Sequence, residues 1–151
     1  RLTDFQCALG LSQLARLEGF WIARDRLARR YRERLACSPF LELPALPADR
    51  RHGWHLFVVL LRLERLTVDR DTVLSALRAE NIGATLHYPL VHLHPFYRRR
   101  FGYGPGLCPI AEAAERRLVT LPLFPSMSEA DQDDVLQALD KVFAHFARPS
   151  S

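Results

Sequence analysis

Lysine and methionine are almost missing from this sequence. Lys141 is the only lysine, so the 21 basic residues are otherwise arginines, and Met127 is the only methionine. Chemistry that needs a Schiff-base lysine has one candidate. That candidate lies one step off the apolar stripe of the last predicted helix, which is typical of a solvated residue. Because the chain opens on Arg1, we expect a piece of a longer protein or a maturation product.

Cysteines and long apolar runs are also few. Cys7, Cys37 and Cys108 are odd in number and far apart, which favours reduced thiols in a cytoplasmic protein over a disulfide framework. No apolar run approaches the roughly 18 residues of a membrane span. The first residues do not lead into the apolar segment of a signal peptide. We therefore expect no membrane partner.

Several motifs that carry chemistry do not occur. The possible zinc ligands His87, His92, His94 and Cys108 fit no CxxC or HxxxH spacing, so we predict no metal site. There is no GxSxG nucleophile motif and no GxGxxG or phosphate loop. Taken alone, the chain lacks a complete catalytic apparatus.

The net charge of +4 and the pI of 9.3 would suit a nucleic-acid-binding protein. However, the usual nucleic-acid-binding motifs are missing, and the excess of arginine over lysine is typical of a genome composition bias. We expect most of the arginines on solvated helix faces and predict no nucleic-acid partner.

The first part of the chain predicts one long helix, from Thr3 to about Cys37. Thr3 and Gln6 fit a capping box, and apolar residues recur every three or four positions. About 35 residues of helix give a rod of roughly 50 Å, which favours an element that bridges two bodies. The apolar stripe consists of Leu11, Leu14, Leu17, Trp21, Ala28, Tyr31 and Leu35.

The middle of the chain predicts a strand–helix–strand unit. Residues 54–61 are apolar and favour a buried strand that follows a proline-broken connector. Asp69 can cap a helix over residues 70–80. Residues 84–88 favour a second strand, which Pro89 ends.

The last part predicts a helix over residues 109–117, a third strand over 118–121 and a final helix. Ser126 and Glu129 fit a capping box for that final helix. Its apolar stripe consists of Val135, Leu139, Val142 and Phe146. The sum is an α/β sandwich in which helices cover one face of a small sheet, mixed or mainly antiparallel.

The segment from His87 to Gly106 concentrates the side chains most useful for a site. It holds three histidines, three tyrosines and three consecutive arginines. Arginine forks suit diphosphates and carboxylates, and aromatic rings suit a nucleobase, so the segment could form the wall of a substrate pocket. The same rings could instead fill a core while the arginines are solvated. The residues themselves leave both interpretations open.

Four blocks of the sequence are informative together. They are RLTDFQCALGLSQLARLE, HGWHLFVVLL, NIGATLHYPLVHLHPFYRRRFG and LVTLPLFPSMSEADQDDVLQAL. In this order they resemble parts of the DegT/DnrJ/StrS nucleotide-sugar aminotransferases: the segment after that family's Asn-Tyr-Arg motif, the first small-domain strand, the IG…HY…PxHxxPxY segment and the LPLFPxLTxxDxxxV ending. The first and third blocks look most like pseudaminic acid transaminases. The second and fourth look equally like aminoarabinose transaminases.

The resemblance implies the small C-terminal domain of the aspartate-aminotransferase-like fold (fold type I). Residues 1–38 would link it to a large domain, and residues 39–151 would form the small domain. It also implies a homodimeric enzyme that depends on pyridoxal 5'-phosphate. Such enzymes move an amino group, usually from glutamate, onto a keto sugar nucleotide, here expected to be a UDP-sugar, for lipopolysaccharide or other glycans. Because the cofactor and its lysine would belong to the large domain, we expect this chain alone to be inactive.

Few site residues follow from the resemblance, and none of them is catalytic. Arg1 matches the arginine of the Asn-Tyr-Arg motif, which lies near cofactor and substrate phosphates in the family. The residues expected to contact the sugar nucleotide are His87, His55, Tyr88, His92, Tyr97 and Arg98.

A second interpretation is a stand-alone sugar-nucleotide-binding or regulatory module without catalysis. The two differ in what they expect of the first helix. In the small domain of an enzyme, Leu11, Leu14 and Trp21 would pack on the large domain. We then expect these three residues to be exposed in this chain and the chain to self-associate.

Overall fold

Three short antiparallel strands form the centre of the chain, whose computed structural model describes residues 1–149. They are β1 (Leu41–Glu42), β2 (Phe57–Leu61) and β3 (Leu118–Leu121), in the spatial order β1-β2-β3. β2 is the middle strand and pairs with both neighbours in antiparallel register. The prediction was a small sheet, mixed or mainly antiparallel, and the structure confirms it with antiparallel pairing throughout the three strands. β1 was not anticipated, because two residues give no periodic signal.

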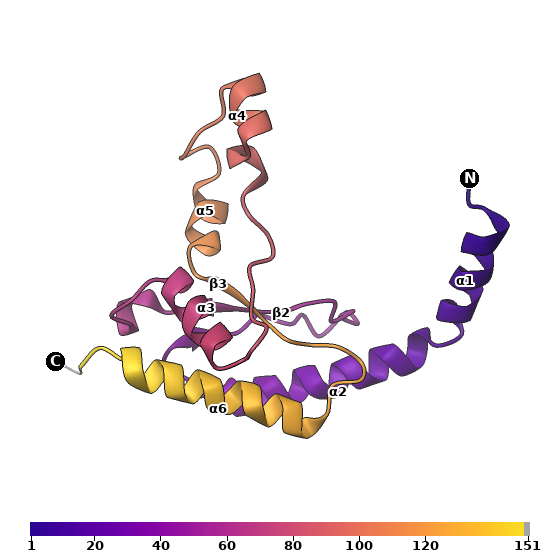
Figure 1. The fold of residues 1–151 in the computed structure, drawn as a ribbon, viewed down its shortest axis with the longest axis horizontal. Helices are drawn as coiled ribbons and strands as arrows, with labels where there is room; N and C mark the ends of the chain where they lie inside the picture. The colour runs from indigo at the N-terminus through magenta and orange to yellow at the C-terminus, as the bar shows by residue number, and fades with distance from the viewer. Residues whose placement is uncertain (150–151) are drawn as a thin grey trace.

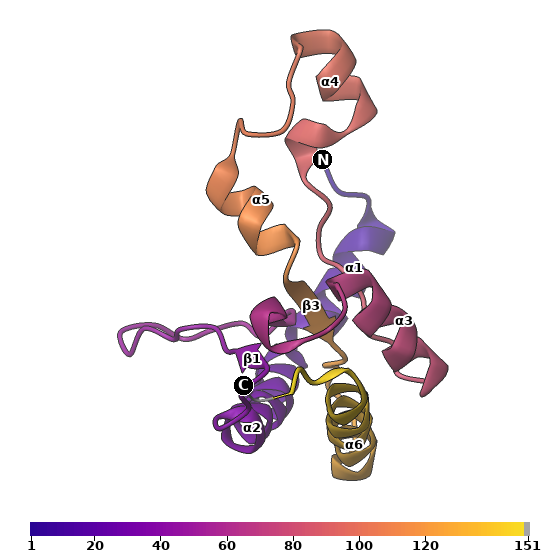
Figure 2. The ribbon, with the colours of Figure 1, turned by 90° about the vertical axis from the view of Figure 1, so that its left-hand side faces the viewer.

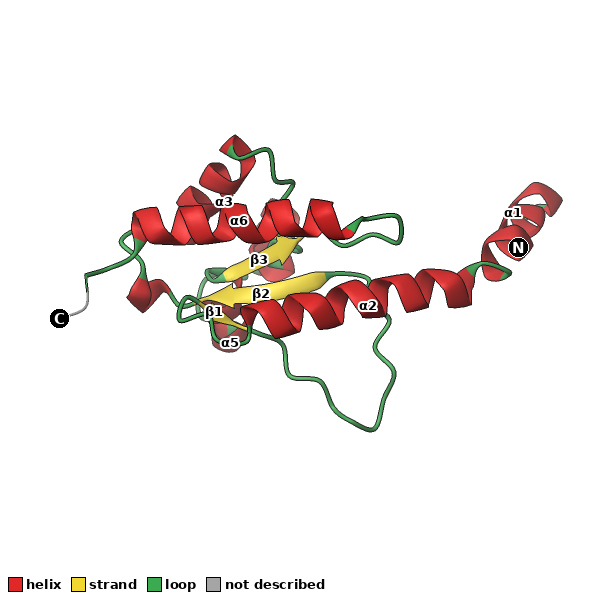
Figure 3. Ribbon diagram, turned by 90° about the horizontal axis from the view of Figure 1, so that it is seen from below, coloured by secondary structure: helices red, strands yellow, loops and turns green. Residues whose placement is uncertain are grey.

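Two long helices cover one face of this sheet, as Figures 1, 2 and 3 show. They are α2 (Leu17–Leu35) and α6 (Glu129–Phe146). A third helix, α3 (Arg70–Ala79), packs against α6 and β3. The expected α/β sandwich with helices on one face is confirmed. Among residues 1–149, no helix combines the length and the apolar composition needed to cross a membrane.

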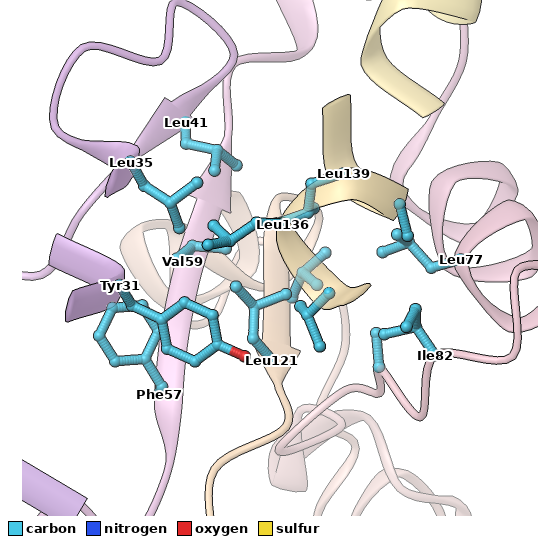
Figure 4. Close-up of a cluster of buried hydrophobic side chains, with 14 of the residues drawn as sticks. Tyr31, Leu35, Leu41, Phe57, Val59, Leu77, Ile82, Leu121, Leu136 and Leu139 are labelled. Atoms are coloured by element: carbon cyan, nitrogen blue, oxygen red, sulfur yellow. The ribbon is translucent and has the colours of Figure 1, made fainter. Parts of the chain in front are cut away.

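The core lies between the sheet and these two helices (Figure 4). Alternate residues of β2 point into it, so that Phe57, Val59 and Leu61 are all buried. The ring of Tyr31 on α2 lies 4.9 Å from the ring of Phe57, and its hydroxyl donates to the carbonyl of Pro122 at 3.1 Å. Burial of each large apolar side chain stabilises the fold by about 1.5–3 kcal/mol.

Polar contacts hold α2 and α6 side by side. Gln132 of α6 is fully buried, and its amide donates to the backbone carbonyl of Leu27 at 2.8 Å. Arg30 donates to Gln132 at 3.1 Å and to Asp133 at 2.7 Å. The buried amide thus has partners for both of its polar atoms.

The predicted single rod is wrong, because the chain forms two helices. The first is α1 (Asp4–Leu14), whose Thr3–Gln6 capping box is confirmed. It ends at Ala15, and α2 begins in a different direction after Arg16, whose backbone has φ −99° and ψ −6° (Figure 1). Since residues 1–19 are all exposed, no tertiary packing holds α1 in line with α2.

The predicted apolar stripe is exposed on α1 and partly covered on α2. Leu11 is 69% exposed and Leu14 is 64% exposed, as expected. Trp21 is instead partly covered, because its indole donates to the carbonyl of His52 at 2.8 Å and the guanidinium of Arg51 lies 3.4 Å from its ring centre.

The second predicted strand is also wrong. Of residues 84–88, only Thr85 pairs with the sheet, in a bridge to Thr120 with N–H···O distances of 3.1 and 2.8 Å. The chain leaves the sheet directly afterwards and reaches Pro89, which has no N–H for a strand ladder. The strand–helix–strand unit is therefore reduced to β2, α3 and a single bridge.

Two further boundaries differ from the prediction. The strand predicted from Trp54 starts at Phe57, because Trp54 has a φ of 46° that does not fit an extended strand. The capping box of α6 consists of Ser128 and Asp131, not Ser126 and Glu129, because the helix begins at Glu129.

Residues 86–117 leave the sheet and return to it as a projecting arm (Figures 1 and 2). The outgoing limb contains the 3₁₀ turn η2 (Val91–Leu93) and leads to α4 (Pro95–Phe101) at the far end. The returning limb contains α5 (Pro109–Glu115) and joins β3. Proline at the first position and Gly102 in the left-handed conformation, with φ 68°, bound α4.

Substitutions in the core and on α1 should differ sharply in their effect on stability. Leu139→Ala removes a fully buried side chain and should lower the free energy of unfolding by about 2–5 kcal/mol. Leu11→Ala changes an exposed side chain and should stay within about 0.5 kcal/mol of the parent. Urea unfolding followed by circular dichroism measures both. Equal losses for the two variants would contradict this placement of the core.

Candidate functional site

His87 and Tyr88 lie at the root of the arm, where the chain leaves the sheet. His87 is half-buried, and its Nδ1 atom is buried without a hydrogen-bond partner among the described residues. Tyr88 is 64% exposed, and its ring stands edge-on to the imidazole with the centres 4.9 Å apart. The exposed ring of Tyr88 is thus the group that the root of the arm leaves open to a ligand, with the partly buried imidazole of His87 beside it.

Tyr97 and Arg98 lie on α4, at the far end of the arm, and no residue of this helix is buried. The ring of Tyr97 is edge-on to Phe96 at 5.3 Å and stacked with Phe101 at 6.1 Å. Arg98 is exposed beside these rings, followed by two more exposed arginines. Rings and guanidinium groups in one place can receive a flat base and an anion.

His92 is placed differently from the other predicted residues. Its Nε2 atom lies 3.0 Å from a carboxylate oxygen of Glu112, and the two side chains are only 11% and 8% exposed. The imidazole therefore faces a carboxylate inside the arm.

Glu112 was missed by the sequence analysis. Its carboxylate accepts hydrogen bonds from the backbone N–H of Gly106, at 2.9 Å to each oxygen, and from that of Cys108 at 3.1 Å. These two N–H groups, and then the His92 ring, hold the pKa of the Glu112 carboxyl below its ordinary value, against the opposing effect of burial. The available signal was an acidic residue in the first turn of a helix that begins with proline.

The base of the arm is fixed to the rest of the fold by two arginines. Arg70, buried at the start of α3, donates to Glu115 at 3.1 Å. Arg117 donates to the carbonyl of Leu61 at 2.8 Å and to Glu42 at 2.6 Å. These contacts join the returning limb to α3, β1 and β2.

His55 does not lie with His87. Val58 and Thr85 both pair with Thr120, and both of their segments run antiparallel to β3, so the two segments run in the same direction. His55 precedes Val58 by three residues, and His87 follows Thr85 by two. The two histidines are thus displaced from this pairing toward opposite ends of the sheet.

Arg1 is also apart from the arm. It precedes α1, is exposed, and lies at the end of the chain that projects beyond α2 (Figure 1). Within the described residues the structure therefore brings together His87 with Tyr88 at the root of the arm, and Tyr97 with Arg98 at its far end.

One hollow lies on the arm itself. It has a volume of about 380 Å³, and Pro89, Leu93, His94 and Glu115 are among the residues that line it. A larger cavity, of about 530 Å³, lies between α2 and the loop before β2, with Trp21 and Trp54 in its wall. None of the predicted site residues lines the larger cavity.

Residues 1–140 match the DegT/DnrJ/EryC1/StrS aminotransferase family. The chain belongs to this family. It is 41% identical, over 137 residues, to the spore coat polysaccharide biosynthesis protein SpsC of Bacillus subtilis (strain 168), covering 90% of this chain and 35% of that protein.

Solved structures of the family share the fold. A DegT DnrJ EryC1 StrS aminotransferase from Brucella abortus is 35% identical with a TM-score of 0.76, over 93% of this chain and 36% of that one. PseC of Helicobacter pylori, an aminotransferase of pseudaminic acid biosynthesis, is 24% identical with a TM-score of 0.86, over 97% and 38%. The fold is that of the small C-terminal domain of the fold type I aminotransferases. The chain spans little more than a third of the length of these relatives.

The residues of this chain do not by themselves fit the family's cofactor, pyridoxal 5'-phosphate. Lys141 is 68% exposed, and its ammonium lies 2.6 Å from a carboxylate oxygen of Glu80. The cavity beside it is also lined by Asp134, so two carboxylates would repel the cofactor's phosphate. As for metals, no group of three or more His, Cys, Asp or Glu side chains that could hold an ion occurs among residues 1–149.

The arm should respond to pH through Glu112. Because the pKa of its carboxyl is lowered in the folded state from the ordinary value of 4.5, the carboxylate stabilises the arm above pH 4.5. That stabilisation is lost as the pH falls through the lowered value. The amide NMR signals of Gly106 and Cys108 should therefore shift with a midpoint below 4.5, and Glu112→Gln should abolish this transition. A midpoint above 4.5 would contradict the assignment.

Proposed function

We propose that this chain is the substrate-facing small domain of an aminotransferase that depends on pyridoxal 5'-phosphate. The complete enzyme would move an amino group from an amino acid, with glutamate as the expected donor, to a keto sugar nucleotide. One observation carries the proposal. A chain of this family projects an arm (Figure 1) that exposes Tyr88 at its root and Arg98 at its far end, beside the partly buried His87 and Tyr97.

The chemistry of each exposed group suggests its part in binding. Arg98 is a fork of N–H donors that suits the diphosphate, and Tyr97 offers a ring face to the base. At the root, the exposed hydroxyl-bearing ring of Tyr88 suits the sugar, and the partly buried imidazole of His87 stands beside it. His55 has the weakest support, since it lies toward the other end of the sheet.

The rest of the enzyme would supply the large domain. Residues 1–38 would link to it and residues 39–151 would form the small domain. The exposed apolar side chains at the start of the chain favour such a covering body, because surfaces of this kind mark interfaces. They are Leu2, Phe5, Leu9, Leu11, Leu14 and Leu17. In a homodimer, Arg1 would reach the phosphates of the neighbouring site.

The cofactor would supply an electron sink for amino transfer, and the large domain would hold it. The residues of this chain would bind and orient the nucleotide sugar and exclude water from it. They include no lysine placed to react, since Lys141 lies on α6, not on the arm, and is paired with Glu80.

The name of one relative supports a product for a surface glycan. SpsC is named for spore coat polysaccharide biosynthesis. We propose a UDP-sugar as the substrate and a surface polysaccharide, such as lipopolysaccharide, as the destination.

Replacement of Arg98 tests the nucleotide contact. In the complete protein, Arg98→Ala should weaken UDP binding about tenfold to a hundredfold, because a charged hydrogen bond to the diphosphate is lost. Arg26→Ala is the matched control, since Arg26 is an exposed arginine on α2 paired with Glu129. Titration calorimetry measures both. Equal UDP affinity in the two variants would show that Arg98 does not contact the nucleotide.

A direct assay separates the proposal from a stand-alone binding module. The complete gene product should transfer an amino group to a keto sugar nucleotide when loaded with pyridoxal phosphate, and the 151-residue chain alone should not. Amino transfer by the chain alone would overturn the assignment of catalysis to another domain. Binding of a UDP-sugar by the complete gene product without any transfer would favour the module.

A further inference from the structure

The arm buries one residue, and that residue carries a carboxylate. Among residues 86–117, Glu112 is the only buried residue, with 7% of its surface exposed. No apolar side chain of the same segment is fully buried: Leu86, Leu90, Leu93 and Tyr97 are partly buried, and seven other large ones are exposed. The exposed ones are Tyr88, Val91, Phe96, Phe101, Tyr103, Leu107 and Ile110. The two limbs of the arm are therefore not held together by an apolar core, as the sheet and its helices are.

Three segments of the arm meet at this carboxylate. His92 approaches from the outgoing limb with its Nε2 atom 3.0 Å from Oε1. Gly106 and Cys108 donate their N–H groups from the loop between α4 and α5. Glu112 itself belongs to α5 on the returning limb. One side chain thus joins segments separated by 20 residues in the sequence, at ordinary hydrogen-bond distances.

We propose that Glu112 is a positioning residue, which fixes the far end of the arm and so sets the placement of Tyr97 and Arg98 toward the nucleotide. His92 acts through Glu112 and does not contact the nucleotide itself. The effect on nucleotide binding rests on the proposed function. The connection that Glu112 makes between the two limbs can be tested independently of that function. Among the described residues, His92 is the titratable side chain hydrogen-bonded to Glu112, and Cys108 meets it through its backbone N–H. His94 and Glu115 line the neighbouring hollow, and Arg70 pairs with Glu115 at the base.

All three partners reach Oε1 of the Glu112 carboxylate, and Oε2 accepts a second time from Gly106. Glutamine at this position keeps the shape but replaces one acceptor oxygen by a donor, which would face the N–H of Gly106. Aspartate keeps both acceptors on a shorter side chain. A residue that merely filled space would tolerate glutamine better than aspartate, and a residue that joins the limbs by its charge would show the opposite order.

Hydrogen exchange of the complete protein tests the connection between the two limbs. Glu112→Gln should speed exchange of the Gly106 and Cys108 amides at least tenfold, while the amides of β2 keep their protection and show that the fold is intact. Glu112→Asp should restore part of the protection, and His92→Ala should produce a smaller loss. Glu129→Gln, in an exposed ion pair on α6, is the control. Unchanged protection of Gly106 in Glu112→Gln would overturn the inference.

UDP affinity tests whether Glu112 helps to place Tyr97 and Arg98 for nucleotide binding. Glu112→Gln should weaken UDP binding severalfold and raise the KM for the nucleotide sugar with little change in kcat. If Arg98→Ala weakens UDP binding and Glu112→Gln does not, the positioning role is wrong. If neither variant changes UDP binding, the arm does not bind the nucleotide and that part of the proposed function is wrong. The hydrogen-exchange result alone then decides whether Glu112 joins the two limbs.

Discussion

Burial of one apolar face of the sheet under α2 and α6 is the constraint on which the rest of the structure depends. β2 contributes alternate buried residues, and β3 is held beside it by four residue pairs. The arm ends directly at the first residue of β3, and α6 follows the last after a short turn. Because β3 is fixed by its pairing with β2, the root of the arm is fixed as well. Without this pairing between β2 and β3, the far end of the arm would have no defined position relative to the core.

The arm is held together by a different kind of interaction from the core. A segment that must present aromatic rings to a ligand or another domain cannot also bury them between its own limbs. A buried carboxylate that accepts three N–H groups holds the limbs together through directional bonds and leaves the rings outside. The cost is the desolvation of a charge, which is offset only while all of its partners are present. The arm is thus specific in shape but sensitive to any change at Glu112.

Local signals were sufficient for part of this fold. The N-cap Asp69, the proline that starts α5 and the capping residues of α1 gave the positions of three helices, because each acts within a few residues of itself. The break between α1 and α2 carries neither proline nor glycine, so periodicity ran through it. The pairing of Thr85 with Thr120 and that of His92 with Glu112 depend on tertiary placement, which no local pattern encodes.

The root of the arm retains polar capacity that the chain itself does not use. Thr85 and Thr120 pair through their backbones, yet the hydroxyl of Thr120 is buried without a partner, as is Nδ1 of His87 two residues beyond Thr85. Buried polar atoms normally have partners, since leaving one unpaired costs about 1–3 kcal/mol. In the core the same chain pairs even the fully buried Gln132. Among the described residues, Nε of Arg24 on α2 is likewise buried without a partner, so such atoms are not confined to the root. What the root leaves open to a ligand or a second body is the exposed ring of Tyr88, beside the imidazole of His87.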